Sequence, residues 1–256
     1  MTARIFGALL LRDAFVARRD VVGIMIRTML QPLLFTFVFG KLLISMGMFP
    51  KAYATVIIPG IVGLSLTTSA IWAVAMPLIA DFGFTKEIED RLLAPVANEV
   101  IAIEKLVAGI LQGALTATVV LPLARLIIGP IPGLTLQKLP LLIVMILLSG
   151  AVFSALGLFL GTAMQPRHIS LMMQIIFAPM IMFGCTYYPW SGLDHFPVLK
   201  YLVLINPLVY VSEGLRATLT PTVPHMPLPV IFIALIAITS LLLWLGMRGF
   251  RKRSIS

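Results

Sequence analysis

Residues that could do chemistry are few in this 256-residue chain, and their spacing matches no catalytic motif. The three histidines lie in separate predicted loops and lack the HExxH spacing of a zinc hydrolase. The single cysteine, Cys185, excludes an internal disulfide and a cysteine-ligated metal site. Neither a GxSxG elbow nor a Walker A loop is present, since Gly40–Lys41 lacks the earlier glycine of that loop. We therefore expect no catalytic residue, cofactor or metal in this chain.

Charge is concentrated in one stretch, Asp81 to Lys105, between two long apolar runs. Thr85 is a suitable N-cap for a short helix, and Glu87 in the first turn suits the helix dipole. Ile88 and Leu92 lie four apart on one face, and the proline that follows ends the helix. The pattern predicts either a polar helix that docks into a cytosolic partner or an ordinary solvated loop. The residues that would make the contact are Thr85, Glu87, Ile88, Glu89, Asp90, Arg91 and Leu92.

A second pair of opposite charges, Glu213 and Arg216, is spaced three residues apart near the end of the segment 188–219. This spacing lets the two side chains pair, and we expect them at the edge of the low-dielectric region. Prolines cut the segment into apolar runs, Val198–Ile205 and Leu208–Leu219, that are too short to cross a bilayer. We expect two short helices on the outer side, dipping into the outer leaflet or lying along it.

The elements that position these residues must be membrane helices. Hydrophobic residues make up 60% of the chain and charged residues 11%, with a mean hydropathy of +1.06. A soluble domain has about 25% charged residues. We predict a single all-α integral membrane domain over residues 1–256. Its expected parts are an interfacial amphipathic helix over 1–22, the charged segment 81–99, and six spans over 23–44, 56–80, 100–128, 139–164, 169–187 and 228–247.

Basic residues indicate the orientation of the chain. With six spans, both termini, the charged segment and the loop 165–168 share one face, which collects thirteen basic residues against six on the other. Lysine and arginine favour the cytoplasmic side, so both termini are expected in the cytoplasm. The thirteen are Arg4, Arg12, Arg18, Arg19, Arg27, Lys86, Arg91, Lys105, Arg167, Arg248, Arg251, Lys252 and Arg253. Because these residues are dispersed next to spans, we expect no nucleic acid partner.

The predicted span cores carry no aspartate or glutamate, which argues against ion- or proton-coupled transport. A face of small residues, Gly150, Ser154, Gly157 and Gly161, runs along the span 139–164. Small residues at this spacing favour close helix packing over a substrate path.

Two motifs in the expected loops resemble one family. The order Tyr188–Pro189, Asn206–Pro207, Tyr210 and Glu213–Gly214–Leu215–Arg216 resembles the segment before the last span of ABC-2 type permeases, the membrane subunits of ATP-binding-cassette exporters. The stretch Glu87 to Pro95 resembles the cytoplasmic coupling segment of the same family. The resemblance covers essentially the whole chain, and it is closest to the drug-resistance and lipooligosaccharide export branch.

The resemblance implies a permease in the bacterial inner membrane that exports an amphipathic lipid, glycolipid, drug or polysaccharide. It implies two copies of a cytosolic ATPase that bind ATP and Mg, a second permease copy, and contact with membrane lipids. The charged segment would then couple the permease to the ATPase. An outer gate would be formed by Tyr188, Pro189, Asn206, Pro207, Tyr210, Glu213 and Arg216. The alternative is a membrane-embedded enzyme or scaffold without transport activity.

Overall fold

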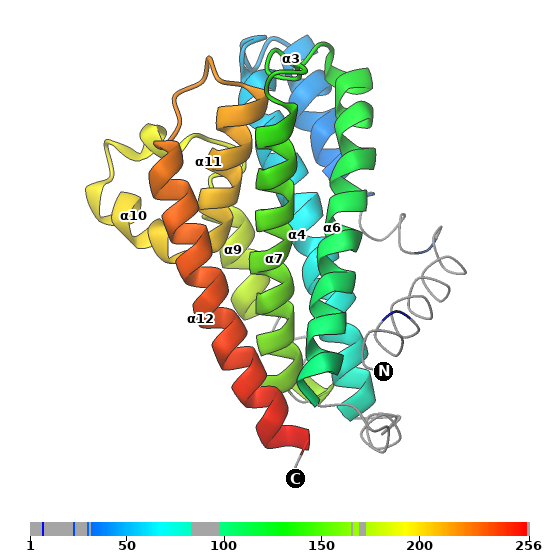
Figure 1. Ribbon diagram of the computed structural model, residues 1–256. Helices are drawn as coiled ribbons and strands as arrows, with labels where there is room; N and C mark the ends of the chain where they lie inside the picture. The colour runs from blue at the N-terminus through cyan, green and yellow to red at the C-terminus, as the bar shows by residue number, and fades with distance from the viewer. Residues whose placement is uncertain are drawn as a thin grey trace.

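Four long helices dominate the computed structural model, which describes residues 32–82, 98–164, 166–168 and 173–254, together with Gly7, Gly23 and Leu30. They stand side by side (Figure 1), and each is long and apolar enough to cross a membrane. Within the described ranges the regular structure is helical and no strand occurs, so the all-α prediction is confirmed there. The four are α4 (Tyr53–Ala80), α6 (Asn98–Ile128), α7 (Leu139–Ala163) and α12 (Leu228–Ser254).

Shorter elements fill the rest of the described chain. An apolar helix over Pro32–Ser45 becomes π-helical in η1 (Val38–Leu42) and ends in α3 (Leu43–Ser45). The helix that leads into α11 is bent by 98° against it, with the break at Asn206. The remaining short elements are η3 (Pro166–His168), η4 (Met173–Phe177), α9 (Ala178–Met182), η5 (Trp190–Leu193), α10 (Pro197–Leu202), η6 (Val203–Ile205) and α11 (Pro207–Leu219).

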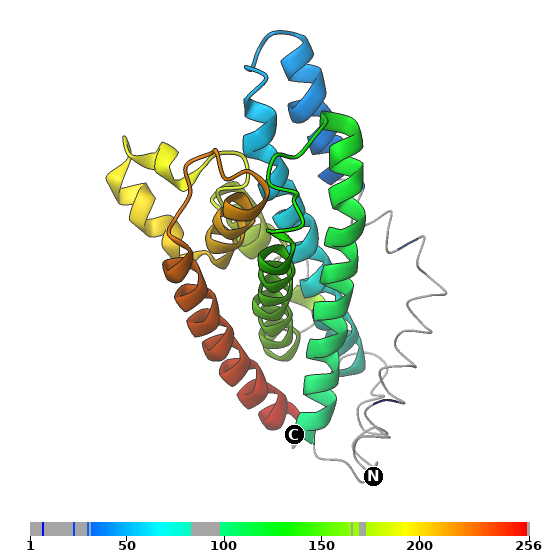
Figure 2. The ribbon, with the colours of Figure 1, turned by 45° about the horizontal axis from the view of Figure 1, so that its top comes forward.

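The helices α4, α7 and α12 run in one direction and α6 runs in the opposite direction (Figure 1), so the bundle has two distinct ends. The C-terminal end holds the last turns of α4, α7 and α12 and the first turn of α6 (Figures 1 and 2). The opposite end, here called the turn end, holds the connections between α6 and α7 and between α11 and α12. The end of α4, the beginning of α6, the end of α7 and the end of α12 therefore lie at one end of the bundle.

The described helices differ from the predicted spans at two places. Within the range 23–44, Gly23, Leu30 and Pro32 onward are described and helical, whereas α12 continues past residue 247 to Ser254. The described part of the range 169–187 is helical over 173–182 and then turns, and within that turn Cys185 adopts a positive φ of 52°, outside the right-handed helical region. By length and composition the described part holds four candidate spans, or five if the bent pair of α10–η6 with α11 counts as one. The interfacial helix over 1–22 and residues 83–97 of the charged segment lie outside the described residues, apart from Gly7.

Small residues let α7 approach its neighbours closely. A Cβ at Gly157 would lie 2.9 Å from the carbonyl oxygen of Ile71 in α4, and one at Gly150 would lie 3.3 Å from the backbone of Ile110 in α6. The small-residue face of this helix therefore serves close packing, as predicted.

The burial of α11 differs from the sequence-based expectation. All twelve of its residues from Leu208 to Leu219 are buried, and the helix packs against α4, α7 and α12. Figure 2 shows α11 enclosed among these helices. Glu213 and Arg216 are fully buried within this helix environment.

Candidate functional site

The first turn of α11 is fixed by Asn206. Its Oδ1 atom accepts a hydrogen bond from the backbone N–H of Leu208 (3.0 Å), which makes it the N-cap, and Pro207 occupies the first helical position. The Asn206 Nδ2 atom donates to the carbonyl of Met180 in α9 (2.8 Å). The hydroxyl of Tyr210 donates to the carbonyl of Leu204 (3.0 Å), which fastens η6 to the same turn. These contacts hold the 98° bend and set the direction in which α11 enters the bundle.

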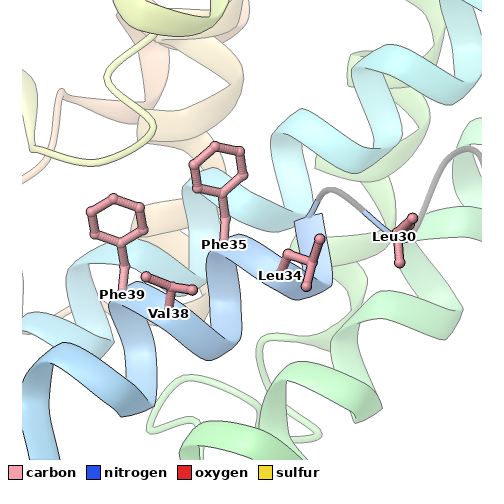
Figure 3. Close-up of a pocket in the computed structure, with 5 residues that line it drawn as sticks. All are labelled: Leu30, Leu34, Phe35, Val38 and Phe39. Carbon is pink, nitrogen blue, oxygen red and sulfur yellow. The ribbon is translucent and has the colours of Figure 1, made fainter.

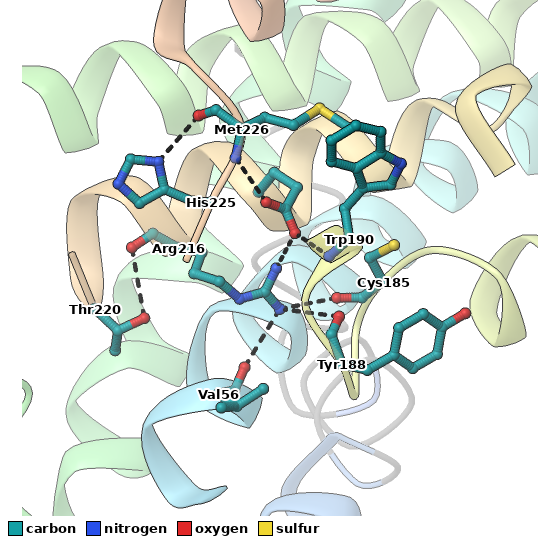
Figure 4. A network of polar contacts seen from close by, with 9 residues as sticks. Val56, Cys185, Tyr188, Trp190, Arg216, Thr220, His225 and Met226 are labelled. Carbon is teal, nitrogen blue, oxygen red and sulfur yellow. Dashed lines mark hydrogen bonds and ion pairs between the residues drawn. The ribbon is translucent and has the colours of Figure 1, made fainter. Parts of the chain in front are cut away.

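One turn further along α11, the carboxylate of Glu213 collects donors from three segments. Its Oε1 atom accepts from Arg216 Nη1 and from the backbone N–H of Trp190 (2.8 Å). Its Oε2 atom accepts from the backbone N–H of Met226 (2.9 Å), as Figure 4 shows. The carboxylate thereby joins α11 to η5 and to the connection that leads into α12.

The guanidinium of Arg216 collects backbone acceptors on the opposite side. Its Nη2 atom donates to the carbonyls of Cys185 (2.9 Å), Val56 (3.4 Å) and Tyr188 (3.4 Å). Val56 lies in the first turns of α4, so the side chain ties α11 to α4 and to the loop after α9 (Figure 4). We call the seven residues Val56, Cys185, Tyr188, Trp190, Glu213, Arg216 and Met226 the Glu213–Arg216 cluster.

Burial makes this cluster a fixed structural unit. Moving two charges out of water is costly, and the cost is offset here by their mutual attraction and by five hydrogen bonds to backbone groups. Through these bonds the pair joins α11 to α4, to η5, to the loop after α9 and to the connection before α12, so it is suited to hold these segments together. The phenol of Tyr188 donates to the carbonyl of Met182 (3.1 Å), and burial, with a smaller effect of Cys185, raises its pKa to about 12.

The structure brings the predicted gate residues together at one side of α11. Tyr188, Glu213 and Arg216 are joined directly, and Pro189 precedes the Trp190 N–H that binds Glu213. Asn206, Pro207 and Tyr210 form the turn at the beginning of the same helix. The predicted coupling residues, Thr85, Glu87, Ile88, Glu89, Asp90, Arg91 and Leu92, all lie outside the described residues.

Sequence reasoning missed Val56, Cys185, Trp190 and Met226, since these residues contribute backbone groups and not side chains. No side-chain pattern marks such partners. The sequence does contain one signal, a glutamate and an arginine on one helical face in an otherwise apolar segment, which must find partners once buried.

The rest of the described chain offers less chemistry. An apolar groove of about 290 Å³ is lined by Leu30, Leu34, Phe35, Val38 and Phe39 and carries no polar group (Figure 3). Among the described residues, no group of three or more histidine, cysteine, aspartate or glutamate side chains is placed to hold a metal ion.

Comparison with known proteins assigns the family. The model of the ABC-2 type transporter family matches residues 4–220. The inner membrane transport permease YadH of Escherichia coli K12 is 26% identical over 209 residues, which is 75% of each chain. The YadH proteins of Escherichia coli O157:H7 and Shigella flexneri match to the same extent. Because the family model spans most of the chain, including the predicted coupling segment and α11, this chain belongs to the ABC-2 type transporter family.

Proposed function

We propose that this chain is the membrane subunit of an ATP-binding-cassette exporter in a bacterial inner membrane. It moves an amphipathic lipid, glycolipid, drug or polysaccharide outward, and hydrolysis takes place on two copies of a separate cytosolic ATPase that bind ATP and Mg. The family match over residues 4–220 carries the proposal, and the inner-membrane relatives support the location. The four long apolar helices agree with a multi-pass membrane protein.

In this proposal six spans place both termini and the charged segment in the cytoplasm. The C-terminal end of the bundle is then the cytoplasmic end, and the turn end faces outward. Exposed apolar side chains on α12, among them Ile233 (69% exposed) and Trp244 (57%), suit contact with lipid tails. A second copy of this chain completes the pathway, which forms between the two permeases.

The Glu213–Arg216 cluster has a defined part in the proposed cycle. Because Arg216 binds the carbonyls of Val56 and Cys185, the predicted gate residues move together with the beginning of α4. The gate is then a rigid unit that tilts as a whole when the two permeases rock apart.

The first test is hydrolysis by a purified complex. The tagged chain is isolated from its native membranes with mild detergent, and ATP hydrolysis is measured for the complex and for the chain alone. We expect a co-purifying ATPase with Walker motifs, hydrolysis by the complex, and none by the isolated chain. Hydrolysis by the chain alone, or no ATPase in the complex, would overturn the proposal and favour the enzyme or scaffold alternative.

The second test is sidedness. Cysteines are placed at the exposed positions 195 and 252 of a Cys185→Ser variant, and each is treated with an impermeant maleimide in cells and in inverted vesicles. The proposed topology predicts labelling of position 195 from outside and of position 252 from the cytoplasm. Labelling of both from one side contradicts it.

A further inference from the structure

The last turns of α12 enclose the end of α7. The Nη1 atom of Arg253 donates to the carbonyls of Gly161 (3.2 Å), Thr162 (3.3 Å) and Met164 (2.9 Å). The final carbonyls of a helix have no partner within it and carry the negative end of its dipole, so a cation there is favourable. Arg253 is thus the cap of α7, supplied by another helix.

The same side chain reaches the end of α4. The guanidinium of Arg253 lies over the ring of Phe82 at 5.1 Å, and Phe82 packs edge-on against Phe250 of α12 with ring centroids 5.7 Å apart. Phe250 is fully buried. Phe82 lies just after the last residue of α4, so α12 contacts the chain at the end of α4 that precedes the charged segment.

A third contact lies at the beginning of α6. Arg251 pairs with Glu99 in the first turn of α6 at 2.9 Å. Figures 1 and 2 both place the C-terminal end of α12 beside the beginning of α6. One end of α12 therefore contacts both helix ends that flank the charged segment, and it caps α7 as well.

We infer that Phe250, Arg251 and Arg253 form a clamp that positions both ends of the coupling segment and passes its displacement to α7 and α12. The inference rests on the proposed function, because it takes the segment between Phe82 and Glu99 to receive force from the ATPase. A segment fixed at both ends to one helix moves that helix when it is pushed, whereas a loosely held segment moves alone. Arg253 is a positioning residue, since it acts through Phe82 and the carbonyls of α7.

Arg248 provides a matched control on the same helix. Its guanidinium lies over the ring of Trp244 at 5.5 Å, within α12 itself. Arg248→Gln removes the same charge as Arg253→Gln, two turns or less away, without removing a contact to Phe82 or to the carbonyls of α7. A difference between the two variants is therefore caused by the loss of the clamp contacts and not by the change in net charge.

Hydrogen exchange tests the clamp without the ATPase. In purified chain in detergent, Arg253→Gln is expected to speed the exchange of amides in residues 78–82 and 158–164 by about fivefold, with residues 208–219 unchanged. Arg248→Gln is expected to match the parent in all three regions. Equal exchange in Arg253→Gln and Arg248→Gln would overturn the inference, even if no ATPase is ever found.

The second test measures, in the complex with the ATPase, whether the clamp passes ATP-driven movement to the rest of the chain. A single cysteine at position 195 in the Cys185→Ser background reports the change in maleimide labelling on addition of ATP and vanadate. In Arg253→Gln we expect ATPase recovery within about twofold of the parent, while the ATP-dependent change falls by about fivefold or more. Arg253→Lys should recover part of it, because an ammonium can bind the carbonyls but lacks the planar stack. An unchanged ATP response in Arg253→Gln, or a loss only in proportion to lost ATPase, would contradict the clamp.

Exchanging the charges of Glu99 and Arg251 gives an independent test of the clamp. Glu99→Arg and Arg251→Glu should each weaken the ATP-dependent labelling change, and the double variant should restore it to within about twofold of the parent. A double variant no better than the worse single variant would show that this pair does not position the segment. If the parent complex contains no ATPase, the proposed function fails, and hydrogen exchange alone then decides the clamp.

Discussion

Two arginines bind backbone carbonyls at opposite ends of the bundle, and their surroundings differ. Arg216 is fully buried with the carboxylate of Glu213, whereas Arg253 is partly exposed and contacts the ring of Phe82. Arg216 joins segments at the turn end, and Arg253 joins helix ends at the C-terminal end. The two sites use the same donor group with different consequences for motion.

Because the two sites differ in burial, separating their contacts costs different amounts of free energy. Separating a buried pair leaves an uncompensated charge and costs about 3–5 kcal/mol. A cation near a helix C-terminus contributes about 0.3–2 kcal/mol, and water can replace it when the contact opens. The Glu213–Arg216 cluster is therefore suited to stay fixed during a transport cycle, while the clamp around Arg253 can rearrange at a cost that a bound partner can supply.

The largest expected effect follows from breaking the buried pair. Arg216→Gln leaves the Glu213 carboxylate buried without its cation, so we expect a loss of about 3–5 kcal/mol in folding stability. The double variant Glu213→Gln/Arg216→Gln removes both charges and should lose less than Arg216→Gln alone. Thermal unfolding in detergent, followed by tryptophan fluorescence, measures both.

The matching change at the other end is Arg253→Gln, which should lower stability by no more than about 2 kcal/mol. If Arg253→Gln and Arg216→Gln destabilise the chain equally, burial does not distinguish the two sites and the comparison fails.

The second effect tests how tightly α4 is held to the loop after α9. A Cβ at Gly60 would overlap the carbonyl oxygen of Thr186, which is backbone and cannot move aside as a side chain can. Gly60→Ala should therefore cost about 1–3 kcal/mol and shift the neighbouring Cys185 carbonyl away from Arg216. Gly192 is the control, since a Cβ there lies 3.8 Å from Pro189, an ordinary contact. A Gly60→Ala variant as stable as Gly192→Ala would show that this contact is loose.

Sequence patterns predicted the parts of the fold that depend on apolar length. The predicted ranges 56–80, 100–128 and 139–164 correspond to α4, α6 and α7, which end at Ala80, Ile128 and Ala163. The pairing of Glu213 with Arg216 was also predicted, because a three-residue spacing on a helix brings two side chains to one face.

The burial of α11 could not be predicted from its length. A mostly apolar stretch of twelve residues after a proline suits a surface helix as well as a buried one, and only the contacts with α4, α7 and α12 decide between them. The contact of Arg253 with α7 could not be predicted for a related reason. A basic residue after an apolar span is typical of membrane topology, and nothing in the pattern shows that its guanidinium binds the carbonyls of α7.

A third, smaller effect concerns the bend before α11. Asn206→Ala removes the N-cap to Leu208 and the hydrogen bond to Met180, and should cost about 1–2 kcal/mol. Asn206→Asp keeps the cap oxygen but loses the donor to Met180, so the two variants separate the contributions. Chemical unfolding in detergent measures them. If Asn206→Asp is as unstable as Asn206→Ala, the contact with α9 and not the cap sets the bend.

The smallest effect is expected at an exposed pair on the same side as the buried cluster. Lys200 Nζ lies 2.5 Å from Asp194 Oδ1, and the Asp194 side chain is 61% exposed. Exposed pairs contribute about 0–1 kcal/mol because water competes for both charges and salt screens them.

After Asp194→Asn the ammonium of Lys200 still lies over the Trp190 ring, at 4.2 Å in the parent, and Trp190 Nε1 still donates to the Lys200 carbonyl. The melting temperature should therefore stay within about 2 °C of the parent at low salt, and the remaining difference should vanish in high salt. A shift comparable to that of Arg216→Gln would mean that geometry, and not burial, sets the strength of charge pairs in this protein, and the contrast between the two arginines would lose its basis.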